Sequence, residues 1–340
     1  MLEIKNLCKT YKNHQGEFRA LDDVSVTVRK GEIFGFIGLS GAGKTSLARC
    51  VAALEKADSG EILFAGEDIT KLKGAKLRET RKKMGLVFQH FNLLMNSTVF
   101  ENIAFPLRIA KKSSRYIHSR VTELLEVVGL TEKSSHYPST LSGGQKQRIG
   151  IARALASEPE LIICDEATSA LDPDTTRSIL ALIKKIGQET GVTFLVITHE
   201  MDVIKELCTH VAVMEGGKII EEGRVLDVLT SPTTDTAKRF FSHEYVDEDW
   251  FKNAAVKQDN SVSKICRAVF IDHNARRPFI NNVVRQFDVE LSVLSGNIES
   301  IGGTMVGSLV LELIGSDEAV ADALNYFTKN GVGIEVIDHV

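Results

Sequence analysis

Short apolar runs alternate with longer amphipathic stretches over the first two thirds of the chain. The clearest runs are Ile33–Ile37, Leu161–Cys164, Thr193–Ile197 and Val211–Met214. Runs of this length, bounded by turn residues, are typical of buried strands. Their alternation with helical stretches is typical of an α/β layered domain. We therefore predict an α/β domain over residues 1–240, with a largely parallel sheet.

The last third of the chain has a different order of elements. It predicts strand, helix, two strands, helix and strand over Ile265–Ile271, Pro278–Phe287, Leu291–Ile298, Met305–Leu313, Asp317–Asn330 and Val332–Ile337. The order βαββαβ is typical of a ferredoxin-like α+β sandwich. We predict this second domain over residues 263–340. Residues 241–262 contain Trp250, and we interpret them as a helix and linker.

Composition agrees with this two-domain picture. The chain has 340 residues, 43% of them hydrophobic and 25% charged, which is a globular balance and enough length for two domains. The net charge is -4 with both signs mixed along the chain, so we predict no nucleic-acid partner. The basic run between Lys71 and Lys83 is interpreted as a solvated helix face.

The cysteines and the hydropathy pattern indicate a cytosolic chain. Cys8, Cys50, Cys164, Cys208 and Cys266 are widely spaced, so we expect free, reduced thiols rather than a metal or disulfide site. We find no signal peptide and no apolar window of about 18 residues, so we expect that the chain neither spans nor crosses a membrane.

A glycine-rich segment, GLSGAGKT, follows the first apolar run and precedes a helical stretch. Its candidate phosphate ligands are Gly38, Ser40, Gly41, Ala42, Gly43, Lys44, Thr45 and Ser46. Glycines allow backbone N–H groups to face phosphate oxygens, and a helix N-terminus adds partial positive charge. Lys44 supplies a full charge, and Thr45 offers a hydroxyl to Mg²⁺. A simple strand-to-helix turn needs neither side chain.

Further polar residues follow other predicted strands. Asp165 and Glu166 come after Leu161–Cys164, and we predict that Asp165 holds Mg²⁺ while Glu166 is the general base. Taken alone, this acidic pair is more typical of a helix cap. His199 is predicted to contact the γ-phosphate and position Glu166. Gln89 is predicted to bind the attacking water or the Mg²⁺.

A second candidate anion site reduces the number of protein classes that fit the phosphate loop. Ser142, Gly143, Gly144 and Gln145 precede the helical run Gln147–Leu155, so their free N–H groups can face an anion. A metabolic kinase has no use for such a segment. A DNA-repair or translation ATPase of related type usually carries long coiled coils or tandem cassettes, whereas this chain has a single phosphate loop and no sustained heptads.

With these motifs, residues Leu2–Pro232 resemble the P-loop nucleotide-binding domain of ABC transporters, including its helical subdomain. The resemblance implies a homodimer that holds two ATP molecules, with Tyr11 stacking on adenine. It implies that Ser142, Gly143, Gly144 and Gln145 contact the ATP of the opposite subunit, and that Asp172, in the turn Ser169–Asp172, is a dimer contact. ATP and Mg²⁺ are the implied cofactors.

The resemblance also implies a separate transmembrane permease dimer. A coupling helix of the permease would dock on an apolar surface, for which the candidates are Phe91, Leu93, Leu94, Val99, Phe100, Ile103, Ala104, Phe105 and Leu107. An ordinary core position remains an equal alternative for each of them. The implied location is the cytoplasmic face of the bacterial inner membrane.

The tail, together with the segment Gln89–Leu107, resembles the ATPase subunits of bacterial methionine importers, which carry an ACT-like, NIL-type regulatory domain. This resemblance implies import of methionine, L- and also D-, delivered by an extracytoplasmic solute-binding protein. It also implies feedback by methionine bound at residues 287–303, with Leu291, Ser292 and Ile298 as candidate contacts. The alternatives are another amino acid or small solute as cargo, an exporter motor, and a tail that only reinforces the dimer.

Overall fold

The computed structural model describes residues 1–13, 16–241 and 262–337. The chain divides into two compact units, Met1–Val225 and Leu226–Val340, and each is described by itself. Residues 242–261, which make up nearly all of the expected helix and linker together with Trp250, lie outside the described ranges.

A mostly parallel sheet forms the centre of the first unit. Its strands are β3 (Ile33–Ile37), β6 (Met84–Phe88), β7 (Leu161–Asp165), β8 (Thr193–Thr198), β9 (His210–Glu215) and β10 (Lys218–Arg224). They lie in the order β10-β9-β3-β8-β7-β6, and only the β9–β10 pair is antiparallel. All residues of β3 are buried, as expected for a parallel strand covered on both faces. The four strands predicted from the sequence are confirmed.

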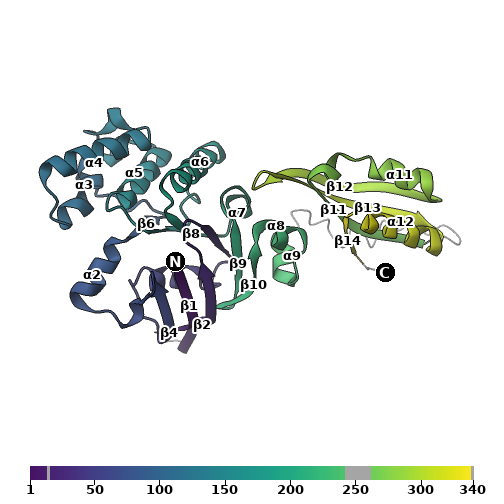
Figure 1. Ribbon diagram of the computed structural model, residues 1–340, viewed down its shortest axis with the longest axis horizontal. Coiled ribbons are helices and arrows are strands. Elements are labelled where there is room, and N and C mark those ends of the chain that lie inside the picture. Colours follow the sequence, from purple (N-terminus) through teal and green to yellow (C-terminus); the bar gives the residue numbers. More distant parts are fainter. Residues whose placement is uncertain (14–15, 242–261, 338–340) are drawn as a thin grey trace. The chain divides into compact units, whose positions relative to one another are not determined.

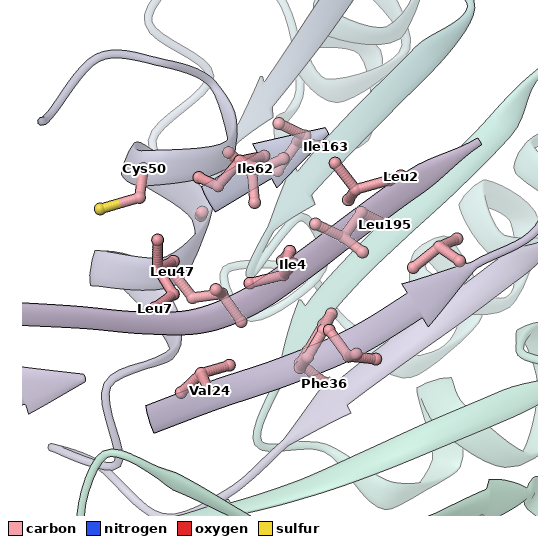
Figure 2. Close-up of a cluster of buried hydrophobic side chains, with 14 of the residues drawn as sticks. Leu2, Ile4, Leu7, Val24, Phe36, Leu47, Cys50, Ile62, Ile163 and Leu195 are labelled. Atoms are coloured by element: carbon pink, nitrogen blue, oxygen red, sulfur yellow. The ribbon is translucent and has the colours of Figure 1, made fainter. Parts of the chain in front are cut away.

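A second, antiparallel sheet packs against the first. It contains β1 (Leu2–Asn13), β2 (Gly16–Val28), β4 (Ser59–Phe64) and β5 (Glu67–Asp68), in the order β2-β1-β4-β5. One apolar core joins Leu2 and Ile4 of β1 to Phe36 of β3, Leu195 of β8 and Leu47 of α1 (Lys44–Val51) (Figure 2). The helix that begins at Lys44 is therefore held between two sheets.

Helix α8 (Val225–Thr230), after its first residue, and α9 (Asp235–Phe241) belong to the second unit. The remaining helices of the first unit include a helical subdomain. These helices are α2 (Gly74–Lys82), α3 (Val99–Ile109), α4 (Ser114–Val127), α5 (Gly143–Leu155), α6 (Pro173–Thr190) and α7 (Met201–Leu207). Helices α3, α4 and α5 pack on one another and gather on the side of this unit away from β1 and β2 (Figure 1). The predicted helical subdomain is present.

The predicted apolar docking surface is only partly a surface. Four of its candidates, Val99, Ile103, Ala104 and Leu107, are buried, because they form the face of α3 that packs inside the helical subdomain. Leu94 and Phe105 are exposed, with 39% and 45% of their surface accessible, and Met95 and Ile109 are exposed as well. The exposed apolar residues of this segment include Leu94, Met95, Phe105 and Ile109.

The tail has the predicted order of elements. These are β11 (Val262–Ile271), α11 (Phe279–Gln286), β12 (Val289–Ile301), β13 (Thr304–Gly315), α12 (Asp317–Lys329) and β14 (Gly333–Val336). Its antiparallel sheet has the order β12-β13-β11-β14, which is the ferredoxin-like arrangement. Phe279 and Phe327 of the helices share a core with Leu311 of β13. Gly302 and Gly303 make the β12–β13 turn with φ of 58° and 92°, values that glycine adopts readily.

Three smaller predictions can also be compared with the fold. The cysteines are free, and all except Cys8 are buried. Basic residues around α2 are solvated and paired, as in the ion pair between Lys76 and Glu67. Among the helices in the described part of the chain, none has both the length and the apolar character to cross a bilayer.

Candidate nucleotide site

The register of the central sheet brings four predicted site residues to one edge. Ile37 of β3 lies opposite Thr198 of β8, and Asp165 of β7 lies opposite both Ile197 of β8 and Phe88 of β6. The residues that directly follow these strand ends are Gly38, Gln89, Glu166 and His199. Ligands of parallel sheets gather at the carboxyl ends of the strands. The sheet therefore forms a single polar edge.

The phosphate loop needs glycine for geometric reasons. Gly41 and Gly43 have φ of 83° and 100°, in the region that favours glycine. A Cβ atom on Gly43 would lie 2.2 Å from the carbonyl oxygen of Ala20, so a side chain there would displace β2. This close packing brings the N-terminus of α1, with its free N–H groups, against the loop.

Lys44 is the first residue of α1 and is buried. Its Nζ donates hydrogen bonds to the carbonyl oxygens of Gly38, at 2.6 Å, and Leu39, at 3.1 Å. Burial lowers the pKa of Lys44, and the charges of Glu166 and Asp165 oppose that shift. The ammonium group therefore lies over the loop and close to the acidic pair, where phosphate oxygens would be expected to bind.

Asp165 is suited to a cation. Burial, followed by the neighbouring charge of Glu166, raises the pKa of Asp165 above its usual value. Its Oδ1 atom is buried and has no hydrogen-bond partner among the described residues. Carboxylate, hydroxyl and amide oxygens are the ligands that Mg²⁺ prefers. This Oδ1 atom of Asp165 therefore fits a Mg²⁺ ligand, and a joint site with Thr45 and Gln89 stays a prediction.

Glu166 is held in an unusual backbone conformation. Its φ is 47°, which is rare outside glycine and costs about 1–3 kcal/mol. Its N–H donates to the carbonyl oxygen of Ile197 at 2.8 Å, and its own carbonyl accepts from the Ser169 hydroxyl at 3.1 Å. The carboxylate lies 3.1 Å from Nδ1 of His199. The fold thus pairs the predicted base with the predicted histidine.

Asp165 and Glu166 do not cap the helix that follows them, so this alternative is wrong. The next helix, α6, begins at Pro173 and is capped by Asp172, which accepts hydrogen bonds from the N–H of Thr175 at 3.0 Å and its hydroxyl at 2.6 Å. These bonds hold the pKa of Asp172 below its usual value. Asp172 therefore has a structural role as the N-cap of α6 within one subunit. Its predicted contact with a second subunit stays a prediction.

The second predicted anion site is the N-terminus of α5. Ser142 is exposed and caps this helix, and Ser142 and Gln145 exchange hydrogen bonds between side chain and backbone at 3.0 and 3.3 Å. A Cβ atom on Gly144 would lie 2.4 Å from Cγ2 of Thr175, so glycine permits close packing against α6. The contact of Ser142, Gly143, Gly144 and Gln145 with a second subunit's ATP stays a prediction.

Two groups of predicted residues lie apart from the sheet edge. Tyr11 lies on β1 and donates a hydrogen bond to Glu55, in the segment that follows α1. The effector candidates lie on β12 of the other unit: Leu291 is half-buried, Ser292 is exposed and Ile298 is 59% exposed. Nothing in the described residues tests the effector role.

One arginine was missed by the sequence analysis. Arg153 of α5 donates to the carbonyl oxygens of Asn92, at 2.7 Å, and Phe91, at 2.9 Å. Phe91 and Asn92 have φ of 59° and 46°, so two consecutive non-glycine residues are left-handed in the segment that begins at Gln89. The available signal was an arginine among the apolar residues of α5, next to Ala152 and Ala154.

Known protein families match both units of the chain. The "ABC transporter" family model matches residues 21–169, and the "NIL domain" model matches residues 264–336. The "Methionine import ATP-binding protein MetN" of Desulfitobacterium hafniense is 45% identical over 343 residues, covering 100% of both chains. Its namesake from Pasteurella multocida is 44% identical over 344 residues, with the same coverage.

The chain belongs to the ABC transporter ATP-binding family. Solved ABC structures agree with the fold. A dimeric, post-hydrolysis ATP-binding cassette, MJ0796, bound to ADP and Pi is 35% identical with a TM-score of 0.61, covering 66% of this chain and 99% of the other. The cassette cbiO1 of Clostridium perfringens is 30% identical with a TM-score of 0.62, covering 68% and 90%. The predicted ABC ATPase fold with a NIL-type tail is confirmed.

Proposed function

We propose that this chain is the ATP-hydrolysing subunit of an ABC importer for methionine. The observation that carries the ATPase assignment is the meeting of Lys44, Asp165, Glu166 and His199 at one sheet edge. The full-length similarity to methionine import ATP-binding proteins, which includes the NIL domain, supports the cargo.

The side chains at this edge divide the chemistry among themselves. The loop Gly38–Ser46 and the N-terminus of α1 bind the phosphates, and Lys44 neutralises charge on them. A Mg²⁺ ion held by Thr45, Gln89 and Asp165 would supply further positive charge at the transferred phosphoryl group. Glu166 accepts the proton of the attacking water, and His199 orients the Glu166 carboxylate.

A second copy of the chain completes the site. The exposed N-terminus of α5, with Ser142, binds the γ-phosphate held by the opposite subunit, so ATP joins the two copies. Hydrolysis removes this contact and lets the copies separate, which is a two-state switch driven by ligand. Dimeric cassettes among the similar solved structures support the homodimer.

The switch acts on a separate permease dimer at the cytoplasmic face of the bacterial inner membrane. The exposed apolar residues Leu94, Met95, Phe105 and Ile109 are the docking surface for a coupling helix of the permease. They follow Gln89 in the chain, so loss of the γ-phosphate can be transmitted to this docking surface. An extracytoplasmic solute-binding protein delivers methionine to the permease.

The tail provides feedback by binding methionine along β12, with Leu291, Ser292 and Ile298 as contacts. The apolar side chain of Ile298 is mostly exposed, so it is accessible to a ligand. The second candidate is a tail that only reinforces the dimer, in an importer of another small solute.

The cargo and feedback are tested by calorimetric titration of the full-length chain with L-methionine, D-methionine and a panel of other amino acids. We expect saturable binding of methionine that Ile298→Glu abolishes. Val284→Glu is the matched control, since Val284 is also an exposed apolar residue of the tail but lies on α11. If no amino acid binds, the second candidate, a tail that only reinforces the dimer, is favoured. If a different amino acid binds more tightly than methionine, that amino acid replaces methionine as the proposed cargo.

A further inference from the structure

The side chain of Tyr11 is held in place by the segment that follows α1, the helix that begins at Lys44. The Tyr11 hydroxyl donates a hydrogen bond to Oε2 of Glu55. The other carboxylate oxygen of Glu55 accepts a hydrogen bond from Nη1 of Arg49 at 3.1 Å. A single carboxylate therefore joins a residue of β1 to a residue of α1.

Glu55 is itself anchored to α1 through the backbone. The N–H groups of Leu54 and Glu55 donate to the carbonyl oxygen of Arg49 at 2.8 and 3.1 Å. Arg49 thus holds Glu55 by both its backbone and its guanidinium, in the last turn of the helix that begins at Lys44. The position of Glu55 relative to the phosphate loop is fixed by one rigid element.

Further contacts tie the end of β1 to the same segment. The N–H of Thr10 donates to Oδ2 of Asp58 at 2.6 Å, and Nζ of Lys9 donates to the carbonyl oxygen of Lys56 at 2.9 Å. The Lys9 ammonium also lies over the Tyr11 ring, 5.2 Å from its centroid. One face of the ring is thus covered by a cation, and the hydroxyl end is fixed by Glu55.

The electrostatics of the pair agree with this geometry. The hydrogen bond from Tyr11 is the largest cause of a lowered pKa of Glu55. Burial, followed by the bond to Glu55, raises the pKa of Tyr11. The stable state of the pair at neutral pH is therefore an ionised Glu55 that accepts a hydrogen bond from the hydroxyl of a neutral Tyr11, which is a charge-assisted hydrogen bond.

We propose that Glu55 is a positioning residue that sets the Tyr11 ring as the platform for the adenine base, at a distance from the phosphate loop that Arg49 and α1 determine. The proposal rests on the proposed ATPase function, and on the stacking of Tyr11 on adenine that the resemblance to ABC transporter ATPases implies. A ring that is already oriented loses little rotational freedom when the base stacks on it, so the hydrogen bond strengthens binding of the base and not of the phosphates.

The test compares binding of ATP with binding of inorganic triphosphate, which lacks the base. In Glu55→Met, which keeps the length of the side chain but removes the acceptor, we expect ATP affinity to fall about five- to tenfold. We expect triphosphate affinity to stay unchanged. Glu55→Gln retains an acceptor and should recover most of the ATP affinity. Glu61→Met is the matched control, because Glu61 is also a partly exposed glutamate with a basic partner, Lys71 at 2.9 Å, away from Tyr11.

A double-mutant cycle separates positioning from general support of the fold. Tyr11→Phe keeps the ring and removes the hydroxyl, so adding Glu55→Met to it should weaken ATP binding no further. Additive effects, an equal loss of triphosphate affinity, or unchanged ATP affinity in Glu55→Met would each overturn the proposal. Tyr11→Ala tests the stacking role of Tyr11 separately from the positioning role of Glu55. If Tyr11→Ala leaves ATP affinity unchanged, the stacking role is wrong. If Tyr11→Ala weakens ATP binding and Glu55→Met does not, only the role of Glu55 is refuted.

Discussion

Replacing Arg153 by methionine should release the segment that follows Gln89. Arg153 donates to the carbonyl oxygens of Phe91 and Asn92, and both of those residues have left-handed backbones. Left-handed conformations are unfavourable for non-glycine residues, so the segment keeps this shape only while other contacts compensate. Methionine fills the same space without donors, and the two carbonyls lose their partner.

The size of the effect follows from the two bonds. Hydrogen bonds from an ionised donor contribute about 1.5–3 kcal/mol each. Burial lowers the pKa of Arg153, so the ionised guanidinium also carries a desolvation cost that reduces the net gain. Opening also relieves the backbone strain of the two left-handed residues, which further favours the opened segment. We expect a net change of about 2 kcal/mol, which corresponds to a roughly thirtyfold larger population of the opened segment.

Hydrogen exchange of the full-length protein measures this population directly. The amides of Phe91 and Asn92 should exchange about thirtyfold faster in Arg153→Met. The amide of Leu94 should change less, because it donates to the side chain of the fully buried Asn102 at 2.7 Å. Arg177→Met, an exposed arginine of α6 paired with Asp174, is the control. Unchanged exchange at Phe91 and Asn92 would refute the reasoning.

Three other substitutions address the nucleotide site. Glu166→Gln should bind ATP without hydrolysing it and so accumulate as a dimer in light scattering; a monomer at saturating ATP would contradict the sandwich arrangement. Ser142→Arg should abolish turnover while ATP binding at Lys44 persists, and surviving turnover would remove Ser142 from the composite site. Asp165→Asn should raise the melting temperature of the nucleotide-free protein at about pH 8. Burial raises the pKa of Asp165 in the fold above the ordinary value of 3.8. The wild-type carboxylate therefore destabilises the fold increasingly as pH rises from that ordinary value through the raised pKa, and the difference should shrink near pH 4. A difference that does not depend on pH would show that ionisation of Asp165 is not its cause.

Local features of the sequence were sufficient for the fold class and the main chemical groups. Buried parallel strands are continuous apolar runs, so Ile33–Ile37 and Leu161–Cys164 were identifiable without any knowledge of their neighbours. The phosphate loop was identifiable because its glycines, lysine and hydroxyl must be consecutive to surround one phosphate chain. Each of these signals lies within about ten residues of chain.

Predictions that depended on orientation were less successful. For the apolar stretch on α3, a docking surface and an ordinary core position were equal alternatives. In the structure Val99, Ile103 and Leu107 are buried, while Phe105 and Ile109 are exposed. Apolar character alone does not say which side of a helix meets a neighbour when most of its positions are apolar. Packing against α4 and α5 decided the matter.

The sequence by itself therefore determined that this chain is an α/β ATPase of the ABC type with a ferredoxin-like tail. Tertiary structure alone decided which distant residues support the chemistry. Glu55 lies 44 positions from Tyr11, and Arg153 lies 61 positions from Asn92, and neither pair has a motif. Such hydrogen bonds form because folding brings separate elements together and buried polar groups must find partners, a requirement that acts on the packed chain and leaves no periodic signal in its sequence.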